Sequence, residues 1–359
     1  MKIAVVANCQ GEAIQKCLMA LNPNIEAVSH MVHNVVGDPG WIERLLQEND
    51  FILAHRMLKN ATVALPADKV VFVPNIAFDG YHPDLTFVRG MTKAGNLESV
   101  VNMLSGYVSG ISLYAYQHGM TVAQAEELFR PEIYDRLGYH NAYDNAYREL
   151  VEEGRLCDLP LDGLLSRWSR MHPFMFSSNH PKMFVIEDVV RNLLKKMGIP
   201  CLFNNVHEYI DDPLREMPIW PIYPGLAERF GLEGDLAFRA GRHCSMLPLN
   251  SFISNCYSHF NLFKAETLEA INLPVASFEE KIGEAALANG RLQEGNPYSQ
   301  VPATQFWRSA VAAVSAPEFD PVSAVKFKIL PSEKVATAGS WFAQHIAPTL
   351  AARGFNYFV

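Results

Sequence analysis

The sequence contains no run of basic residues, and its formal net charge is −8 over 359 residues. A nucleic-acid-binding protein presents a basic patch to the phosphate backbone, so DNA and RNA are not expected partners. No apolar stretch is long enough to cross a bilayer, and the apolar start at 2–7 meets polar residues too soon for a signal peptide. We therefore expect a cytoplasmic protein without a membrane span.

Cysteine pairs at metal-binding or redox spacing are also absent. The six cysteines are scattered singly, with no Cys-x-x-Cys motif, whereas zinc sites and disulfide scaffolds need clustered cysteines. The combination of His243 and Cys244 with Cys256 and His259 has the residue types of a zinc site, but its Phe- and Leu-rich surroundings favour core positions. We expect reduced thiols and no bound metal.

Glycine-rich phosphate-binding loops are missing as well. A single glycine, Gly11, follows the first apolar run, where a dinucleotide-binding fingerprint needs three, and no Walker motif is present. NAD and P-loop chemistry are therefore disfavoured. The composition, with 49% hydrophobic and 19% charged residues, is that of an ordinary globular protein, and the length exceeds the usual limit for one core.

Short apolar runs alternate with helical patterns over about residues 1–95. Four runs have the length and character of buried strands: 2–7, 25–32, 51–54 and 70–73. Apolar residues at helical spacing follow the first run, at Ile14, Cys17, Leu18 and Leu21. This alternation predicts an α/β fold with a small doubly wound parallel sheet, of the Rossmann or SGNH-like kind.

Helical patterns dominate from about 96 to 315, and we expect this large helical region to form a cradle. The first helix is predicted through Val100, Leu104, Val108 and Ile111. A capping box at Thr121 predicts a helix over 122–130, and further helices are expected over 142–153, 161–171 and 182–197. Four prolines within 211–224 predict a long surface loop.

Cys9 is the candidate centre of a site, because it follows the first strand in the run Asn8-Cys9-Gln10. Ligands of open parallel sheets bind outside the carboxyl ends of the strands. A helix N-terminus favours thiolate, so we expect a lowered pKa and a nucleophilic sulfur. The alternative is a small residue that only fills a tight turn.

A nucleophilic thiol needs a base, and a neutral imidazole is the commonest one. His180 is the first candidate, since Pro181 fits a first helical turn and would place Asn179 and His180 at the N-cap, where the helix dipole disfavours imidazolium. His82 is the second, with the Asp84 carboxylate two residues on to orient its ring. His172 is the third. His180 could instead serve only as an N-cap.

Three segments in order carry a resemblance to a known family: Asn8-Cys9-Gln10, Pro74-Asn75 leading into 80–84, and 179–181. Over about residues 1–300 they resemble the WcbI family of polysaccharide-biosynthesis enzymes, although Ala7 stands where that family usually has glycine. The resemblance implies an acetyltransferase that binds coenzyme A in a deep cradle and acts on a capsule sugar hydroxyl.

We read three residues as catalytic and six as cofactor-binding. The catalytic candidates are Cys9, His180 and His82. The candidates for binding coenzyme A or acetyl-CoA are Asn8, Gln10, Gly11, Arg56, Tyr81 and Asn179. Backbone N–H groups at Cys9 and Gln10, with the Asn8 side chain, are expected to stabilise an oxyanion.

The C-terminal segment resembles the first strand and helix of the GSCFA family, relatives of SGNH esterases. Its motif reads Gly339-Ser340-Trp341-Phe342-Ala343, with Trp341 where that family has cysteine. We therefore expect a WcbI-like domain at 1–315 and an incomplete GSCFA-like start at 316–359.

The resulting hypothesis is acetyl transfer from acetyl-CoA to a carbohydrate hydroxyl, with a small-molecule or polysaccharide acceptor as partner. Cys9 would form an acyl-thioester or only lie beside the thioester of acetyl-CoA. Two alternatives stay open: an SGNH-like carbohydrate acetyl esterase, and a non-catalytic module that binds coenzyme A. The sequence leaves the oligomeric state open, a homo-oligomer included.

Overall fold

The computed structural model describes residues 1–171, 173–241 and 246–289, together with 332, 334–335, 350, 352–354 and 356–357. The chain divides into two compact units, Met1–Gly290 and Arg291–Val359. In the second unit, β14 (Lys334–Val335) pairs in parallel with β15 (Asn356–Tyr357). The boundary predicted at 315 and the motif at 339–343 lie outside the described residues.

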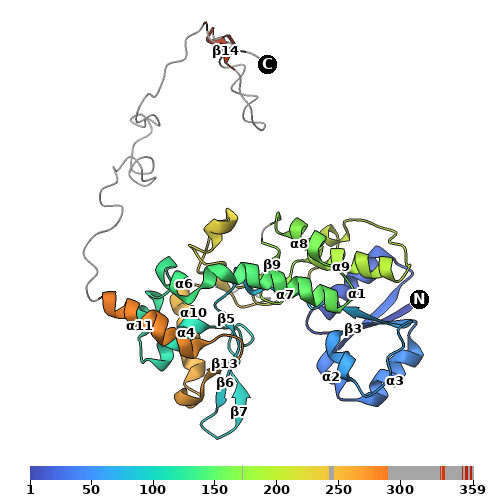
Figure 1. Ribbon diagram of the computed structural model, residues 1–359, viewed down its shortest axis with the longest axis horizontal. Helices are drawn as coiled ribbons and strands as arrows, with labels where there is room; N and C mark the ends of the chain where they lie inside the picture. Colours follow the sequence, from blue (N-terminus) through green and yellow to red (C-terminus); the bar gives the residue numbers. More distant parts are fainter. Residues whose placement is uncertain are drawn as a thin grey trace. The chain divides into compact units, whose positions relative to one another are not determined.

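A four-stranded parallel sheet forms the N-terminal part of the first unit (Figure 1). Its strands are β1 (Lys2–Ala7), β2 (Glu26–Met31), β3 (Phe51–His55) and β4 (Val70–Val73). The order is β2-β1-β3-β4, so successive connections leave β1 in opposite directions. The four predicted strands and the α/β fold class are confirmed.

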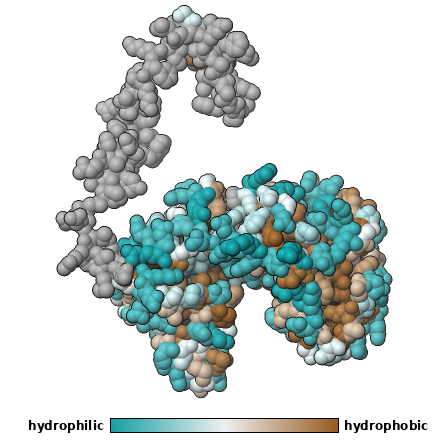
Figure 2. Space-filling model, viewed as in Figure 1, coloured by the Kyte–Doolittle hydropathy of each residue, from teal (hydrophilic) through white to brown (hydrophobic). Residues whose placement is uncertain are grey.

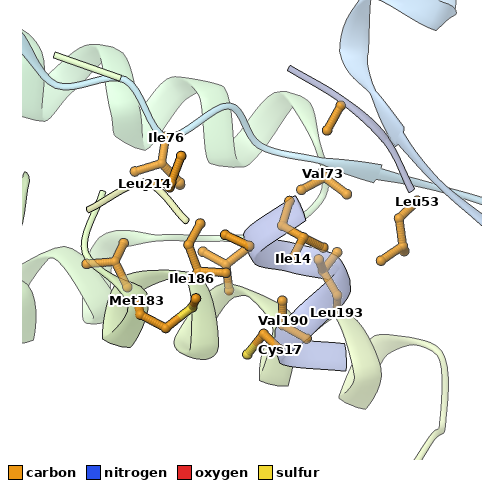
Figure 3. Close-up of a cluster of buried hydrophobic side chains, with 14 of the residues drawn as sticks. Ile14, Cys17, Leu53, Val73, Ile76, Met183, Ile186, Val190, Leu193 and Leu214 are labelled. Carbon is orange, nitrogen blue, oxygen red and sulfur yellow. The ribbon is translucent and has the colours of Figure 1, made fainter. Parts of the chain in front are cut away.

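Helices cover both faces of this sheet, because side chains alternate between faces along each strand. On one face Ile3 and Val5 pack with α1 (Gly11–Leu21) and α9 (Met183–Lys196); Figure 3 shows Ile14 and Cys17 of α1 among Ile186, Val190 and Leu193 of α9. On the other, Ala4 and Val6 pack with α2 (Val32–Val36) and α3 (Pro39–Glu48). The sheet is therefore doubly wound.

The middle of the chain builds a second hydrophobic core from short helices and small sheets. The α-helices of this second core are α4 (Gly110–Gln117), α5 (Val122–Glu126), α6 (Pro131–Leu137), α10 (Leu249–Phe260) and α11 (Phe278–Asn289). Two further helices, α7 (Ala142–Leu156) and α8 (Asp162–Trp168), pack in the first core with α1 and α9. The short strands are β5 (Leu85–Thr86), β6 (Val88–Met91), β7 (Leu97–Ser99), β8 (Val108–Ser109), β9 (Met175–Ser177), β10 (His180–Pro181), β11 (Phe238–Arg239), β12 (Met246–Leu247) and β13 (Glu269–Ala270).

Single 3₁₀ turns connect these elements. They are η1 (Arg56–Asn60), η2 (Asp79–Tyr81), η3 (Tyr139–Asn141), η4 (Val206–Glu208), η5 (Ala227–Phe230), η6 (Ala265–Thr267) and η7 (Val275–Ser277). Among the described residues, no helix combines the length and the apolar character that crossing a membrane requires. Figure 2 shows mainly hydrophilic residues over α7 and hydrophobic residues gathered over the N-terminal sheet, whose edge strand leaves Val28 and Met31 exposed.

The helix predicted through Val100 to Ile111 is wrong in its first half. Residues 103–106 form a turn, 108–109 belong to β8, and α4 begins only at Gly110. Ser105 and Gly106 both have positive φ, and the Asn102 side chain accepts hydrogen bonds from the backbone N–H groups of Leu104 and Gly106. These local bonds replace the helical pattern that the apolar spacing suggested.

The proline-rich segment 211–224 is irregular, as predicted, but it is not a surface loop throughout. Leu214, Trp220 and Tyr223 are each at most 2% exposed. Trp220 packs edge-on against Phe238 and Phe252, and its backbone N–H donates to the Phe176 carbonyl. Leu214 packs in the first core and Trp220 and Tyr223 in the second, so this segment contributes to both. Its Pro218 carbonyl contacts the site described next.

Candidate functional site

Cys9 lies at the point where the strand order of the sheet reverses. β2 lies on one side of β1 and β3 on the other, so the loop after β1 opens into the crevice that binds ligands in such sheets. Gly11 starts α1 and is buried there; a Cβ at this position would come 2.4 Å from Ser29 Oγ. The glycine thus permits the close approach of α1 to β2, while its predicted role in cofactor binding stays a prediction.

Gln10 holds three distant segments together beneath this loop. Its side chain is 2% exposed, and its Nε2 donates to the carbonyls of Ile76 (2.9 Å) and Asn179 (3.0 Å). Its Oε1 accepts from the Ile76 N–H at 3.2 Å. Beside it, Asn8 Nδ2 donates to Asn75 Oδ1 at 2.7 Å. These bonds fix the Cys9 loop against the segments after β4 and β9.

The predicted oxyanion donors in this loop are largely engaged already. The backbone N–H of Gln10 donates to Asn8 Oδ1 at 3.0 Å, and the Asn8 amide is occupied by Asn75. By contrast, Asn179 Nδ2 points at the Cys9 sulfur from 3.8 Å, and sulfur is only a weak acceptor. Asn179 is therefore the better placed donor beside Cys9.

Cys9 is half-buried, and this burial decides its protonation state. Burial raises the pKa of the Cys9 thiol above its ordinary value, and the residue's own backbone N–H offsets this only in part. The expectation of a lowered pKa is wrong, because desolvation of the thiolate outweighs the effect of the helix N-terminus. At neutral pH Cys9 carries a thiol.

Tyr107 connects Asn179 with His180. Its hydroxyl donates to Asn179 Oδ1, accepts a hydrogen bond from Ser177 Oγ at 3.2 Å and lies 3.2 Å from His180 Nε2. Burial raises the Tyr107 pKa, with a smaller contribution from the nearby Cys9 sulfur. Cys9, Asn179, Tyr107 and His180 thus form one chain of polar contacts.

His180 is neutral, though not for the predicted reason. It lies in β10, and α9 begins only at Met183 with Lys182 as its N-cap, so the predicted N-cap position is wrong. Burial lowers the His180 pKa to about 4, against a smaller opposing effect of a hydrogen bond to the Pro218 carbonyl. Because β10 pairs with β9, the backbone stays extended through Pro181, and the helix begins later than predicted.

His82 is buried beside segment 218–221, whose Pro218 carbonyl also bonds His180. Its Nδ1 lies 3.4 Å from the Pro221 carbonyl, and burial lowers its pKa to about 3. The prediction that Asp84 orients this ring is wrong. Its carboxylate instead accepts from the Ile111 N–H and the hydroxyls of Tyr139 and Tyr223, because the chain turns between His82 and Leu85.

The remaining predicted residues, Arg56 and Tyr81, are not members of this chain of contacts. Arg56 binds Glu153 through Nε and a terminal nitrogen, each at 3.1 Å, and Glu153 accepts from the Asn75 N–H, which links Arg56 to the Asn8 side. Tyr81 is buried in an aromatic cluster with Phe78 and Phe174. His172, His243 and Cys244 lie outside the described residues.

A large cavity of about 1,240 Å³ lies along α1 and the start of α9, and its lining does not include Cys9, Asn179 or His180. Its lining includes Glu12 of α1, three residues after Cys9, and Phe176 of β9, three residues before Asn179. Lys182 and Arg215 also line it. Asp212, which lines the same cavity, attracts both cations electrostatically.

The sequence profile of a known family matches residues 2–202, more than half of the chain; its description is "Polysaccharide biosynthesis enzyme WcbI". The chain belongs to the WcbI family. A comparison with curated proteins gives no match. No comparison supports the predicted GSCFA-like segment.

A solved structure of WcbI shares the fold. It is 16% identical, covers 81% of this chain and 95% of its own length, and superposes with a TM-score of 0.53. That protein is described as a novel polysaccharide biosynthesis enzyme, in its native form without a disulfide bond between coenzyme A and one of its cysteines. The predicted family is confirmed.

Within this WcbI family member, the structure brings together the predicted residues Asn8, Cys9, Gln10, Asn179 and His180. Sequence reasoning missed Tyr107 and Ser177 as members of the cluster. Tyr107 follows the turn at 105–106 that was read as helix, so no periodic signal marked it. Asn75 was quoted only as part of the family pattern, although its position after β4 places it at the same edge as Cys9.

Proposed function

We propose that this WcbI family member transfers an acetyl group from acetyl-CoA to a carbohydrate hydroxyl. One observation carries the proposal: the contact chain Cys9, Asn179, Tyr107 and His180 lies at the switch point of the sheet. It combines a side-chain amide and a neutral imidazole, which can serve as the oxyanion donor and the general base of acyl transfer, with a thiol beside them.

Coenzyme A occupies the large cavity in this proposal, with its thiol end beside Cys9. The volume of about 1,240 Å³ is ample for a cofactor of that size, and Lys182 and Arg215 would pair with its phosphates. A disulfide between coenzyme A and a cysteine, as named for the WcbI structure, needs the two sulfurs in contact. We assign that place to Cys9 here.

In the proposed reaction the sugar hydroxyl attacks the thioester carbonyl directly. His180 takes the hydroxyl proton, the Asn179 amide stabilises the oxyanion, and the thioester C–S bond breaks. Coenzyme A leaves as a thiolate that takes this proton from His180, which returns the imidazole to its neutral form. The raised pKa of Cys9 favours this route over a covalent acyl-cysteine, because a protonated thiol is a weak nucleophile. Cys9 then lines the pocket at the reacting carbonyl.

Release of the coenzyme thiol from acetyl-CoA in the presence of oligosaccharide acceptors tests this function. Asn179→Ala should lower the acceptor-dependent rate by roughly 10²-fold, the usual cost of one oxyanion donor. Cys201→Ser is the matched control, since Cys201 is also half-buried but lies outside the cluster, and it should keep the wild-type rate.

Cys9→Ala separates the two chemical routes. Direct transfer predicts a reduced but measurable rate and no acetylated protein by intact mass, whereas a covalent route predicts complete loss and an acetyl group on Cys9 of the wild type. Calorimetry with coenzyme A tests whether the protein binds the cofactor. A protein that takes up no coenzyme A at millimolar concentration would contradict it.

A further inference from the structure

A second, smaller cavity of about 350 Å³ lies along the β9 strand. Its walls are mainly apolar and aromatic, with Met175, Phe176, Ile219 and Ile222 among them, and two exposed carboxylates, Glu233 and Asp235, also line it. It shares Phe176, Lys182 and Ile219 with the large cavity. The two cavities therefore adjoin.

Two buried nitrogen atoms of its lining have no hydrogen-bond partner among the described residues: His82 Nε2 and Trp220 Nε1. Both side chains are 2% exposed. Unsatisfied buried polar atoms are rare in folded proteins and call for an explanation. Two of them in one cavity point to a ligand that satisfies both.

The two nitrogens have opposite hydrogen-bonding character. Nδ1 of His82 faces the Pro221 carbonyl, which can only accept, so the ring proton belongs on Nδ1 and Nε2 presents a lone pair. Burial keeps this ring neutral. The indole Nε1 of Trp220 can only donate. The residues that line the cavity thus include one unpartnered acceptor and one unpartnered donor, both buried.

A hydroxyl group is the ligand group that fits this pair, because it donates one hydrogen bond and accepts another. A carboxylate or phosphate oxygen would satisfy Trp220 but would face the lone pair of His82. Two carboxylates against the single cation Lys182 further disfavour an anion. Aromatic walls beside a hydroxyl-binding pair suit the apolar face of a sugar ring.

We propose that this cavity is the acceptor subsite, in which a hydroxyl of a neutral sugar lies between His82 Nε2 and Trp220 Nε1. The transfer itself rests on the function proposed above. One segment spans both sites, since the Pro218 carbonyl bonds His180 and the Pro221 carbonyl faces His82. His82 accordingly binds and positions the acceptor, while another hydroxyl of the same sugar reacts at His180.

Nuclear magnetic resonance of the full chain labelled with ¹⁵N-tryptophan tests this subsite without any acyl donor. The chain has five tryptophans, and Trp220→Phe identifies the indole signal of Trp220 by its loss. Methyl glycosides of neutral hexoses, added at millimolar concentrations, should shift that signal saturably. The signal of Trp41, in the sheet region, should stay in place.

His82→Leu removes the acceptor but leaves the reporting indole intact, and it should weaken glycoside binding by roughly two- to tenfold, as expected for one neutral hydrogen bond. A Trp220 signal that no glycoside moves in the wild type would overturn the proposal, whether or not His82→Leu folds. So would equal affinity in wild type and variant. A parallel titration with coenzyme A separates failure of the subsite from failure of the proposed function.

Discussion

At the scale of single residues, burial governs the chemistry of the candidate site more than local charge does. Cys9, His82 and His180 all have pKa values displaced toward the neutral form, with desolvation as the largest cause. From the sequence, the helix N-terminus after Cys9 suggested the opposite for the thiol. Solvent exclusion by segments 75–76 and 179–180, both far along the chain, could not be read from the local sequence.

Alkylation of Cys9 should therefore be slow at neutral pH. We expect the rate of reaction with iodoacetamide, followed by peptide mass analysis, to rise with pH and to reach half its maximum above 9.0, the ordinary value for a cysteine thiol. Cys201 is measured in the same digest for comparison. A midpoint well below 9.0 at Cys9 would show an activated thiolate and contradict the direct-transfer route.

Acid should destabilise the fold through His180. Its folded-state pKa of about 4 lies below the ordinary 6.5, so its contribution to stability is complete above pH 6.5 and is lost as the pH falls toward 4. Between pH 7.5 and 5 this amounts to about 2 kcal/mol. His180→Gln should show a correspondingly smaller drop in urea-unfolding free energy, and an unchanged drop would refute the assignment.

At the scale of elements, regular periodic patterns were sufficient to predict structure. The four strands and α9 were predicted to within one or two residues, the apolar spacing after β1 correctly predicted a helix at α1, and the capping box at Thr121 forms as expected. The prediction failed where side chains redirected the backbone, as Asn102 does before α4, and where a strand pair replaced a helix start at His180. Such contacts have no periodic signal.

The turn η2 packs on α7 at Gly80, and this contact leaves no room for a side chain. A Cβ at Gly80 would lie 2.5 Å from Phe78 Cε1 and 2.8 Å from the Tyr143 backbone. Gly80→Ala should therefore lower the unfolding free energy by about 1–3 kcal/mol, as overpacking does. Chemical denaturation measures it.

Gly163→Ala is the matched control, because a Cβ there meets nothing within 4 Å. Since alanine favours helix over glycine by up to about 1 kcal/mol, this variant should be as stable as the wild type or more so. Equal destabilisation by both substitutions would show that the η2 contact is not the cause.

At the scale of the whole molecule, the site exists only because four distant stretches meet at one edge of the sheet. The family resemblance rested on the order of three of them, the runs at Cys9, Asn75 and His180, and the comparison with the WcbI family confirmed it. The fourth stretch, which contributes Tyr107, and the cavity along β9 needed the folded chain. Their residues come together through tertiary packing, for which a single sequence gives no register.

The central claim is that Cys9 lies beside the thiol end of bound coenzyme A, and thiol–disulfide exchange tests it most directly. We would incubate the protein with coenzyme A disulfide and map the adduct by mass spectrometry, with excess desulfo-coenzyme A, which has no thiol, as competitor. The account predicts one coenzyme A per chain, on Cys9, and suppression of the adduct by the competitor. Equal labelling of the half-buried Cys201, or labelling that the competitor leaves unchanged, would contradict it.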